Sequence, residues 1–483
     1  MDGAISEAGE LRAAARASAR TLAWLIPLLL YAFCVLFITA HHEPWRDEAD
    51  AWMVSRDNGL GGLFRLTGYM GHPSLWYLVL MPLTRLGLSY ETALFVNPLI
   101  AIAATALLLA RAPFPLWLRC LIAFSFFPAY EYAVIARSYA LTMLCIFALA
   151  ALDARRAQRP ILYGCLIAAL ANTNTHGLVI AAGLGALLVA DWWQGESRKA
   201  ASKAAAVALL GGIVSVLQLW PPADRQVLPV EPWLSVVPKL FASVVIPGYG
   251  EPGIHQAALA LHALAIAVML WFLWPRRRAF CYFAGVTSVL TGLFLFVYIG
   301  GPRHAGLITL VGISAAWIGS ARAPLPGARV TGFALAPVLA ISTAFTVVWW
   351  TLDYRGQYSG AERMADYIIE NDLTERPIAA YEDGKTMAVL AHLPRDTFWY
   401  AGRGREGSHM TWDMEYVEAH RFDMNQAIGR INEAFRDDPD VLILLNAGFR
   451  NPEAFGARLL YASDRRIVGR PEERFYLYEK LAR

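Results

Sequence analysis

The chain has 483 residues, of which 57% are apolar and only 17% are charged. A soluble domain is rarely so apolar, so this composition excludes an ordinary soluble protein and predicts a polytopic membrane protein. The net charge of +3 is small, and its basic residues are concentrated in short loops, which argues against nucleic acid as a partner.

The first candidate span is the uncharged stretch 21–40. A spanning helix needs roughly 20 apolar residues, because each residue rises about 1.5 Å against a hydrocarbon core of about 30 Å. No small-residue cleavage site precedes the acidic, aromatic segment that follows. We therefore expect this helix to remain as an anchor rather than to be removed as a signal peptide.

Further charge-poor segments bring the total to eleven or twelve. They lie at 73–88, 91–110, 116–130, 138–152, 161–172, 175–191, 204–220, 257–274, 279–299, 305–320 and 331–351. The short segment 73–88 contains Pro82 and Arg85. With it, three apolar segments lie between two loops that are both predicted to face outward, whereas a chain that crosses the membrane at every segment needs two or four. We expect it to enter the membrane without a net crossing.

The composition changes near residue 353, after which charge is dense and mixed and no long apolar run occurs. These features divide the chain into a membrane domain, 1–352, and a soluble α/β domain, 353–483. The expected helices are 361–371, 384–393 and 424–436, the expected strands are 377–381, 396–401 and 441–446, and a hairpin is expected at 466–478.

Orientation follows from the basic loops, because lysine and arginine near span ends are retained in the cytoplasm. The residues concerned are Arg12, Arg16, Arg20, Arg155, Arg156, Arg159, Arg198, Lys199, Lys203, Arg276, Arg277, Arg278, Arg322 and Arg329. The N-terminus is then cytoplasmic, and the loops 41–72, 128–137, 172–176, 221–256 and 300–304 face outward with the C-terminal domain. The chain is predicted to be a multi-pass protein of the inner (plasma) membrane.

The first outward loop holds the densest polar cluster, with Arg46, Asp47 and Glu48 between Trp45 and Trp52. If 47–56 is a helix, the two carboxylates point about 100° apart, so one can face a cavity while the other braces it. The tryptophans fit an interfacial aromatic belt. The alternative interpretation is a solvated loop beside the membrane.

Three further polar clusters lie on the same predicted side. Their members are Glu131, Arg137 and Tyr139 in the second loop, residues 172–176 ending in His176, and the pair Arg303 and His304. Each alone fits a structural role such as a snorkelling anchor. Because all four clusters face outward in the same topology, they can converge on one site.

These residues resemble the GT-C superfamily of glycosyltransferases that use lipid-linked sugars. The resemblance rests on Asp47-Glu48 followed by His72-Pro73, on the run 136–141, which is similar to Ala-Arg-x-Tyr-x-Leu, and on Arg303-His304, which resembles a late Arg-Tyr element. Protein O-mannosyltransferases and aminoarabinose transferases are familiar members. The chain departs from the pattern at His304, which replaces tyrosine, and at Glu131, where members vary.

The resemblance implies transfer of a sugar from a polyprenyl-phosphate donor to an acceptor glycan, lipid or protein, with inversion at the anomeric carbon. It makes Asp47 the catalytic base, and gives Glu48 an orienting or binding role. Arg137 and Arg303 would stabilise the departing phosphate. The other expected substrate-binding residues are Arg46, His72, Glu131, Tyr139, His176 and His304. A divalent metal held by these histidines with Asp47 or Glu48 is left open.

Two other classes of function are also considered. A transporter or flippase would carry polar residues midway along its spans, where alternating-access sites lie. Here the strongest ionisable residues lie at the outer ends of spans instead. The best mid-span candidates, Asn97 and Gln218, are neutral, and His262 is the exception. A non-catalytic anchor for the C-terminal domain would need no acidic loop with arginines on the same side.

Overall fold

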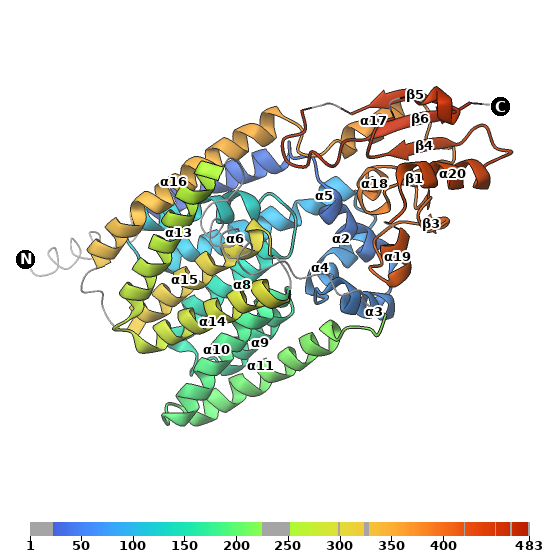
Figure 1. Ribbon diagram of the computed structural model, residues 1–483. Coiled ribbons are helices and arrows are strands. Elements are labelled where there is room, and N and C mark those ends of the chain that lie inside the picture. The colour runs from blue at the N-terminus through green and yellow to red at the C-terminus, as the bar shows by residue number, and fades with distance from the viewer. Residues whose placement is uncertain are drawn as a thin grey trace, which may run out of the picture.

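The computed structural model describes residues 23–224, 252–297, 300–322, 328–419, 421–449, 451–463 and 466–481. A bundle of helices forms the larger part of the molecule, and a sheet with its own helices lies at one end of the bundle (Figure 1). The predicted order of a helical membrane part followed by an α/β part is confirmed.

Five helical stretches among the described residues are long and apolar enough to cross a membrane. They are α5 (Tyr90–Leu94) continued by α6 (Val96–Arg111), α10 (Thr175–Trp193), α11 (Arg198–Leu219), α14 (Arg277–Phe296), and Leu335–Arg355 within α16 (Ala328–Arg355). Shorter apolar helices are Ala23–Thr39, α9 (Pro160–Ala171) and His262–Leu273 within α13 (Pro252–Leu273). α8 (Tyr139–Leu152) and α15 (Pro302–Arg322) complete the bundle.

Two predicted apolar segments do not form simple spans. The segment 73–88 contains α4 (Leu75–Arg85), whose 11 residues extend only about 16 Å and cannot cross a hydrocarbon core alone. The segment 116–130 is divided between α7 (Leu116–Ala123) and the π-helical turn Phe127–Glu131. Such interrupted helices are tolerated at membrane depth where protein surrounds them, and this turn is buried throughout.

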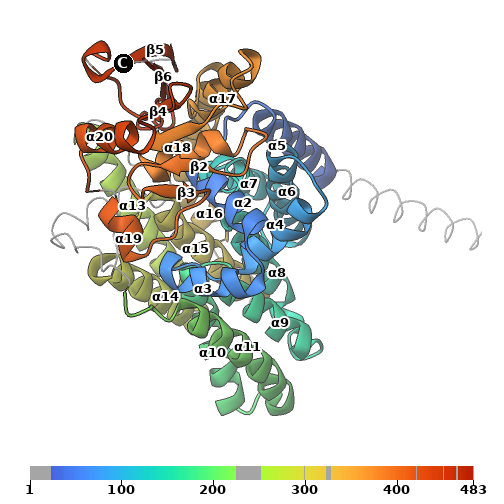
Figure 2. The ribbon, with the colours of Figure 1, turned by 90° about the vertical axis from the view of Figure 1, so that its right-hand side faces the viewer.

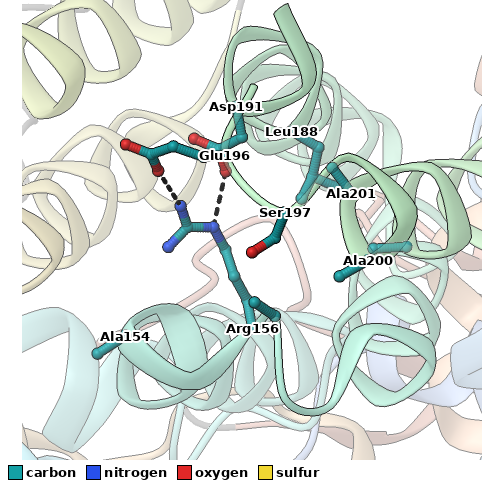
Figure 3. A pocket seen from close by; sticks show the side chains of 10 residues that line it. Ala154, Arg156, Leu188, Asp191, Glu196, Ser197, Ala200 and Ala201 are labelled. Atoms are coloured by element: carbon teal, nitrogen blue, oxygen red, sulfur yellow. Dashed lines mark hydrogen bonds and ion pairs between the residues drawn. The ribbon is translucent and has the colours of Figure 1, made fainter. Parts of the chain in front are cut away.

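The described basic loops around Arg156, Arg198 and Arg278 gather at the end of the bundle away from the C-terminal sheet (Figure 1). There Arg156 Nε lies 2.7 Å from Asp191 Oδ2 and Arg156 Nη2 lies 3.5 Å from Glu196 Oε2, beside a cavity of about 340 Å³ (Figure 3). Arg278 also pairs with Asp191 and ties α14 to α10. These ion pairs hold together the helix ends that lie away from the C-terminal sheet. Arg12, Arg16 and Arg20 lie outside the described residues.

The C-terminal part contains a six-stranded mixed sheet in the order β3-β2-β1-β4-β6-β5. Its strands are β1 (Ile378–Tyr381), β2 (Phe398–Tyr400), β3 (Arg405–Gly407), β4 (Leu442–Leu445), β5 (Ala457–Ala462) and β6 (Tyr476–Lys480). The helices are α17 (Ala361–Glu370), α18 (Asp383–Leu390), α19 (Met414–Ala419) and α20 (Met424–Ala434). β1 is parallel to β2 and β4, and the other neighbours are antiparallel.

The predicted hairpin at 466–478 is wrong. The antiparallel strands are β5 and β6, and most of the predicted stretch is the connection between them. That connection turns toward the membrane part instead, where Arg470 contacts Trp45 and Glu473 contacts Arg46. Tertiary contacts thus determine the conformation of a segment whose local pattern suggested a strand.

Helix α2 (Arg46–Asp57) lies between the bundle and the sheet, with α18 packed against it (Figure 1, Figure 2). One apolar cluster runs from Ala49 and Met53 of α2, through Trp76 of α4, to Met387 and Leu390 of α18. Because this core is continuous, the C-terminal part is packed rigidly on the helix that carries the acidic pair.

Candidate active site

The N-terminus of α2 is stabilised by carboxylates from both parts of the chain. Glu48 accepts the backbone N–H of Trp45 at 3.2 Å, and Glu473 accepts that of Arg46 at 3.2 Å. Ser359 Oγ donates to Glu473 Oε2 at 2.8 Å. Carboxyl oxygens at a helix N-terminus satisfy N–H groups that have no partner within the helix, so these contacts hold the first turn in place.

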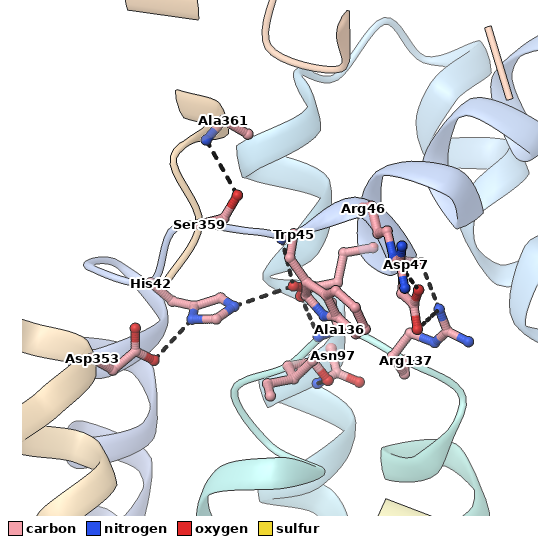
Figure 4. A network of polar contacts seen from close by, with 12 residues as sticks. His42, Trp45, Arg46, Asp47, Asn97, Ala136, Arg137, Asp353, Ser359 and Ala361 are labelled. Atoms are coloured by element: carbon pink, nitrogen blue, oxygen red, sulfur yellow. Dashed lines mark hydrogen bonds and ion pairs between the residues drawn. The ribbon is translucent and has the colours of Figure 1, made fainter. Parts of the chain in front are cut away.

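Asp47, in that first turn, lies among arginines from three separate segments, of which Figure 4 labels Arg46 and Arg137. Its Oδ2 is 2.8 Å from Arg303 Nη2 and 3.1 Å from Arg137 Nη1, and its Oδ1 is 3.7 Å from Arg46 Nε. Arg137 Nη1 also donates to the Asp47 carbonyl oxygen at 2.7 Å. Three elements of the predicted site therefore meet at one carboxylate.

These arginines control the protonation of Asp47. Burial alone would raise its pKa, but the guanidinium groups, led by Arg137 and then Arg303, outweigh burial and hold the pKa of Asp47 well below its usual range. In this arrangement Asp47 is ionised at neutral pH and is a weak proton acceptor.

Glu48 is directed to a different group of residues. Its Oε1 accepts the Ala136 N–H at 2.5 Å, and its Oε2 lies 3.2 Å from His42 Nε2. His42 Nδ1 is in turn 2.8 Å from Asp353 Oδ2 at the end of α16. Glu48 thus joins the first loop to the second loop and to the last helix of the bundle.

His42 carries the positive charge of this network. Burial by itself lowers its pKa, but the carboxylates of Asp353 and Glu48 outweigh burial and raise the pKa of His42 well above its usual range. The stabilisation that protonated His42 gives the folded protein is therefore complete below the ordinary histidine pKa. It is lost as the pH rises through the raised pKa of His42.

We expect His42→Leu to lower the free energy of unfolding by about 3–5 kcal/mol, because it leaves two buried carboxylates without their cation. Thermal unfolding of the purified protein in detergent measures this loss. His41→Leu is the matched control, since His41 is exposed and its Nδ1 contacts only the Phe37 carbonyl oxygen. Equal melting temperatures for the parent and His42→Leu would contradict the role of the network.

Aromatic rings and histidines border the arginine cluster. Tyr132 donates to the Arg303 carbonyl oxygen at 2.6 Å and stacks on Tyr139 at 5.3 Å. The Tyr139 ring meets the edge of His304 at 5.9 Å, and His304 stacks on His176 at 4.7 Å. These contacts bring the second, third and fourth predicted clusters to the same end of the bundle as Asp47.

Two other predicted residues lie within electrostatic range of the arginines. Burial, followed by the charge of Arg137, lowers the pKa of His72 to about 3, so this imidazole is neutral. Burial raises the pKa of Glu131, although the charges of Arg303 and Arg470 oppose it. The other predicted site residues thus lie within electrostatic range of Arg303; they are His72, Glu131, Tyr139, His176 and His304.

No protein-family model and no curated protein matches the sequence. Solved structures do match over nearly the whole length. ArnT from Cupriavidus metallidurans in the apo state superposes with a TM-score of 0.58 at 12% identity, covering 95% of this chain and 98% of that one. The chain has an ArnT-like fold. The same ArnT bound to undecaprenyl phosphate gives a TM-score of 0.57 with the same identity and coverage.

Within this ArnT-like fold, sequence reasoning missed two contacts from the C-terminal part. Arg470 lies 3.5 Å above the Trp45 ring, which Arg303 also approaches at 5.4 Å. Glu473 binds the first turn of α2, and burial raises its pKa to about 8. No local signal could have identified these residues, because they lie more than 400 positions from their partners.

The two tryptophans of the first loop do not form an interfacial belt. Trp45 is 2% exposed and Trp52 is 5% exposed, so both are packed inside the protein. Trp45 instead supports arginines through cation–π contacts. The expectation of membrane anchoring was wrong because the C-terminal part and α4 cover this loop.

Within the described part of the chain, no three His, Cys, Asp or Glu side chains gather in a way that could hold a metal ion. Asp47 faces guanidinium groups, and His304 Nδ1 accepts the Gly301 N–H at 2.7 Å. His176 and His304 stack face to face rather than converging on a point. The residues present do not fit the metal site that the sequence left open.

Proposed function

We propose that this protein is a glycosyltransferase that moves a sugar from a polyprenyl-phosphate donor to an acceptor on the outer face of the membrane. The observation that carries the proposal is the position of Asp47 between Arg137 and Arg303, in a chain with an ArnT-like fold. An acid beside two phosphate-binding cations matches what this transfer needs: a proton acceptor and stabilisation of a phosphate leaving group.

In the proposed reaction, an acceptor hydroxyl or amine attacks the anomeric carbon from the face opposite the phosphate. The new bond to the sugar forms as the bond to the phosphate oxygen breaks, which inverts the anomeric centre. Asp47 takes the acceptor's proton, and Arg137 and Arg303 receive the negative charge of polyprenyl phosphate in bidentate contacts. Arg46, His72, Glu131, Tyr139, His176 and His304 are proposed to bind the two substrates.

The buried polar residues along the spans do not favour a flippase. The Asn97 side chain donates to the carbonyl oxygens of Tyr132, Ala133 and Ile135. Gln218 accepts the Ser74 N–H at 2.8 Å and donates to Asn172. Both residues hold loops in place, which is a structural role rather than an alternating-access site.

Release of free polyprenyl phosphate tests the proposal. Purified protein in liposomes should release it from at least one member of a panel of polyprenyl-phosphate sugars when acceptor glycans, lipids or peptides are present. A flippase would move the lipid-linked sugar across the bilayer and leave the phosphate–sugar bond intact. Movement without release, for every donor and acceptor, would exclude the transferase.

We also propose that the C-terminal domain faces outward and the N-terminus faces the cytoplasm. A cysteine-free variant carrying Asp396→Cys should react with an impermeant thiol reagent in cells whose outer barrier is permeable, since the Asp396 side chain is 93% exposed. Lys199→Cys, at the other end of the bundle, is the matched control and should react only after the inner membrane is broken. The reverse pattern would overturn the orientation.

A further inference from the structure

The cations that would receive a donor phosphate already hold an anion of the protein. One oxygen of the Asp47 carboxylate accepts a hydrogen bond from Arg303 at 2.8 Å and forms an ion pair with Arg137 at 3.1 Å. The planar guanidinium group of arginine can bind two oxygens of a carboxylate or of a phosphate through parallel N–H groups. A phosphate and the Asp47 carboxylate would therefore compete for the same donors.

We propose that Asp47 is an internal anion that the donor phosphate displaces, so that the base is released only when the donor is bound. This inference rests on the proposed function. In the exchange, phosphate oxygens take the Arg303 and Arg137 contacts, and the freed carboxylate turns toward the acceptor. No covalent bond changes in this step, because one anion replaces another.

The surroundings suit such an exchange. The side chains of Asp47, Arg137 and Arg303 keep 13%, 14% and 19% of their surface exposed, so none of the three is sealed off from solvent. Arg137 stays anchored through the Asp47 carbonyl oxygen, which does not move with the carboxylate. Arg303 stays supported by the Trp45 ring. Both cations remain in place when the carboxylate leaves.

The exchange also changes the chemistry of the base. With the guanidinium groups facing it, Asp47 is a weak proton acceptor; once they bind phosphate, burial dominates and its pKa rises. Arg46, whose Nε lies 3.7 Å from Asp47 Oδ1, and Arg470 also act on this carboxylate. Asp50 and His72 lie within electrostatic range of it as well. Asp47 is thus a poor base for activating water in the resting state and a better one once the donor is bound.

Binding of undecaprenyl phosphate to the full-length protein in detergent tests the displacement without any turnover. Removing the competing charge by Asp47→Asn or Asp47→Ala should lower Kd by about tenfold or more, which corresponds to about 1.4 kcal/mol. Asp57→Asn is the matched control, because Asp57 lies on the same helix and pairs with Arg56, away from the site. Its Kd should equal that of the parent.

Proton uptake is a second measurement that a purely structural role for Asp47 would not affect. Calorimetry near pH 5, in buffers with different ionisation heats, should show the parent taking up more protons per bound lipid than Asp47→Asn. Equal or weaker binding by both Asp47 variants, or equal proton uptake, would overturn the displacement alone. If the parent bound no polyprenyl phosphate at all, the proposed function would fail as well.

Discussion

Asp47→Asn should lower the rate of sugar transfer by about 10²–10⁴-fold, the usual effect of losing a general base. Asparagine is nearly isosteric and can still accept from Arg303 and Arg137, so the first turn of α2 should remain folded. Product formation at saturating donor measures the chemical step, and donor binding measured separately should improve rather than weaken. Slower chemistry with tighter binding would be the combined signature of Asp47.

Two other carboxylates provide the comparison. Glu131→Gln tests the alternative base, since Glu131 is buried within range of Arg303. Glu48→Gln should lower the melting temperature, because Glu48 holds His42 and the Ala136 N–H. Near-parental turnover by Asp47→Asn, together with inactive Glu131→Gln, would reassign the base; full activity of all three variants would remove the main support for a transferase.

Arg303→Ala should lower kcat/KM by about 10²-fold or more. Truncating one member of a buried charge pair costs about 2–5 kcal/mol. Here the substitution removes a guanidinium group that would bind the phosphate, and it leaves Asp47 with fewer partners. Arg303→Lys keeps the charge but loses the planar fork, so its kcat/KM should lie between those of the parent and the alanine variant.

The Arg303 variants are compared by steady-state kinetics and by direct binding of polyprenyl phosphate. Arg363→Ala is a control for loss of an arginine, because Arg363 is 60% exposed and contacts only the edge of the first loop, at Glu43. If both Arg303 variants bound and turned over lipid-linked sugar as the parent does, Arg303 would not hold the phosphate.

Most of the fold follows from simple patterns in the sequence. Long apolar stretches predict the spanning helices, and the change of period near 377–381 and 441–446 predicts the two central strands β1 and β4. The interruption of 116–130 was harder to predict. Pro128 lies within the π-helical turn, but only the surrounding protein makes an interrupted helix stable at that depth.

The candidate site was only partly predictable. Asp47, Arg137 and Arg303 could be placed on one side because alternating basic loops fix which span ends lie together. Their mutual contacts, and the separate network of Glu48 with His42 and Asp353, depend on packing that no local pattern encodes. Arg470 was missed for the same reason, since charged residues in a loop usually face water.

The bond between Glu473 and Arg46 also bears on how the protein is made. Arg46 leaves the ribosome 427 residues ahead of Glu473. The bundle of helices can therefore be inserted while the start of α2 still lacks its cap. A product that stops before Glu473 would keep its membrane helices and lose this contact, so complete assembly of the site requires the segment that carries Glu473.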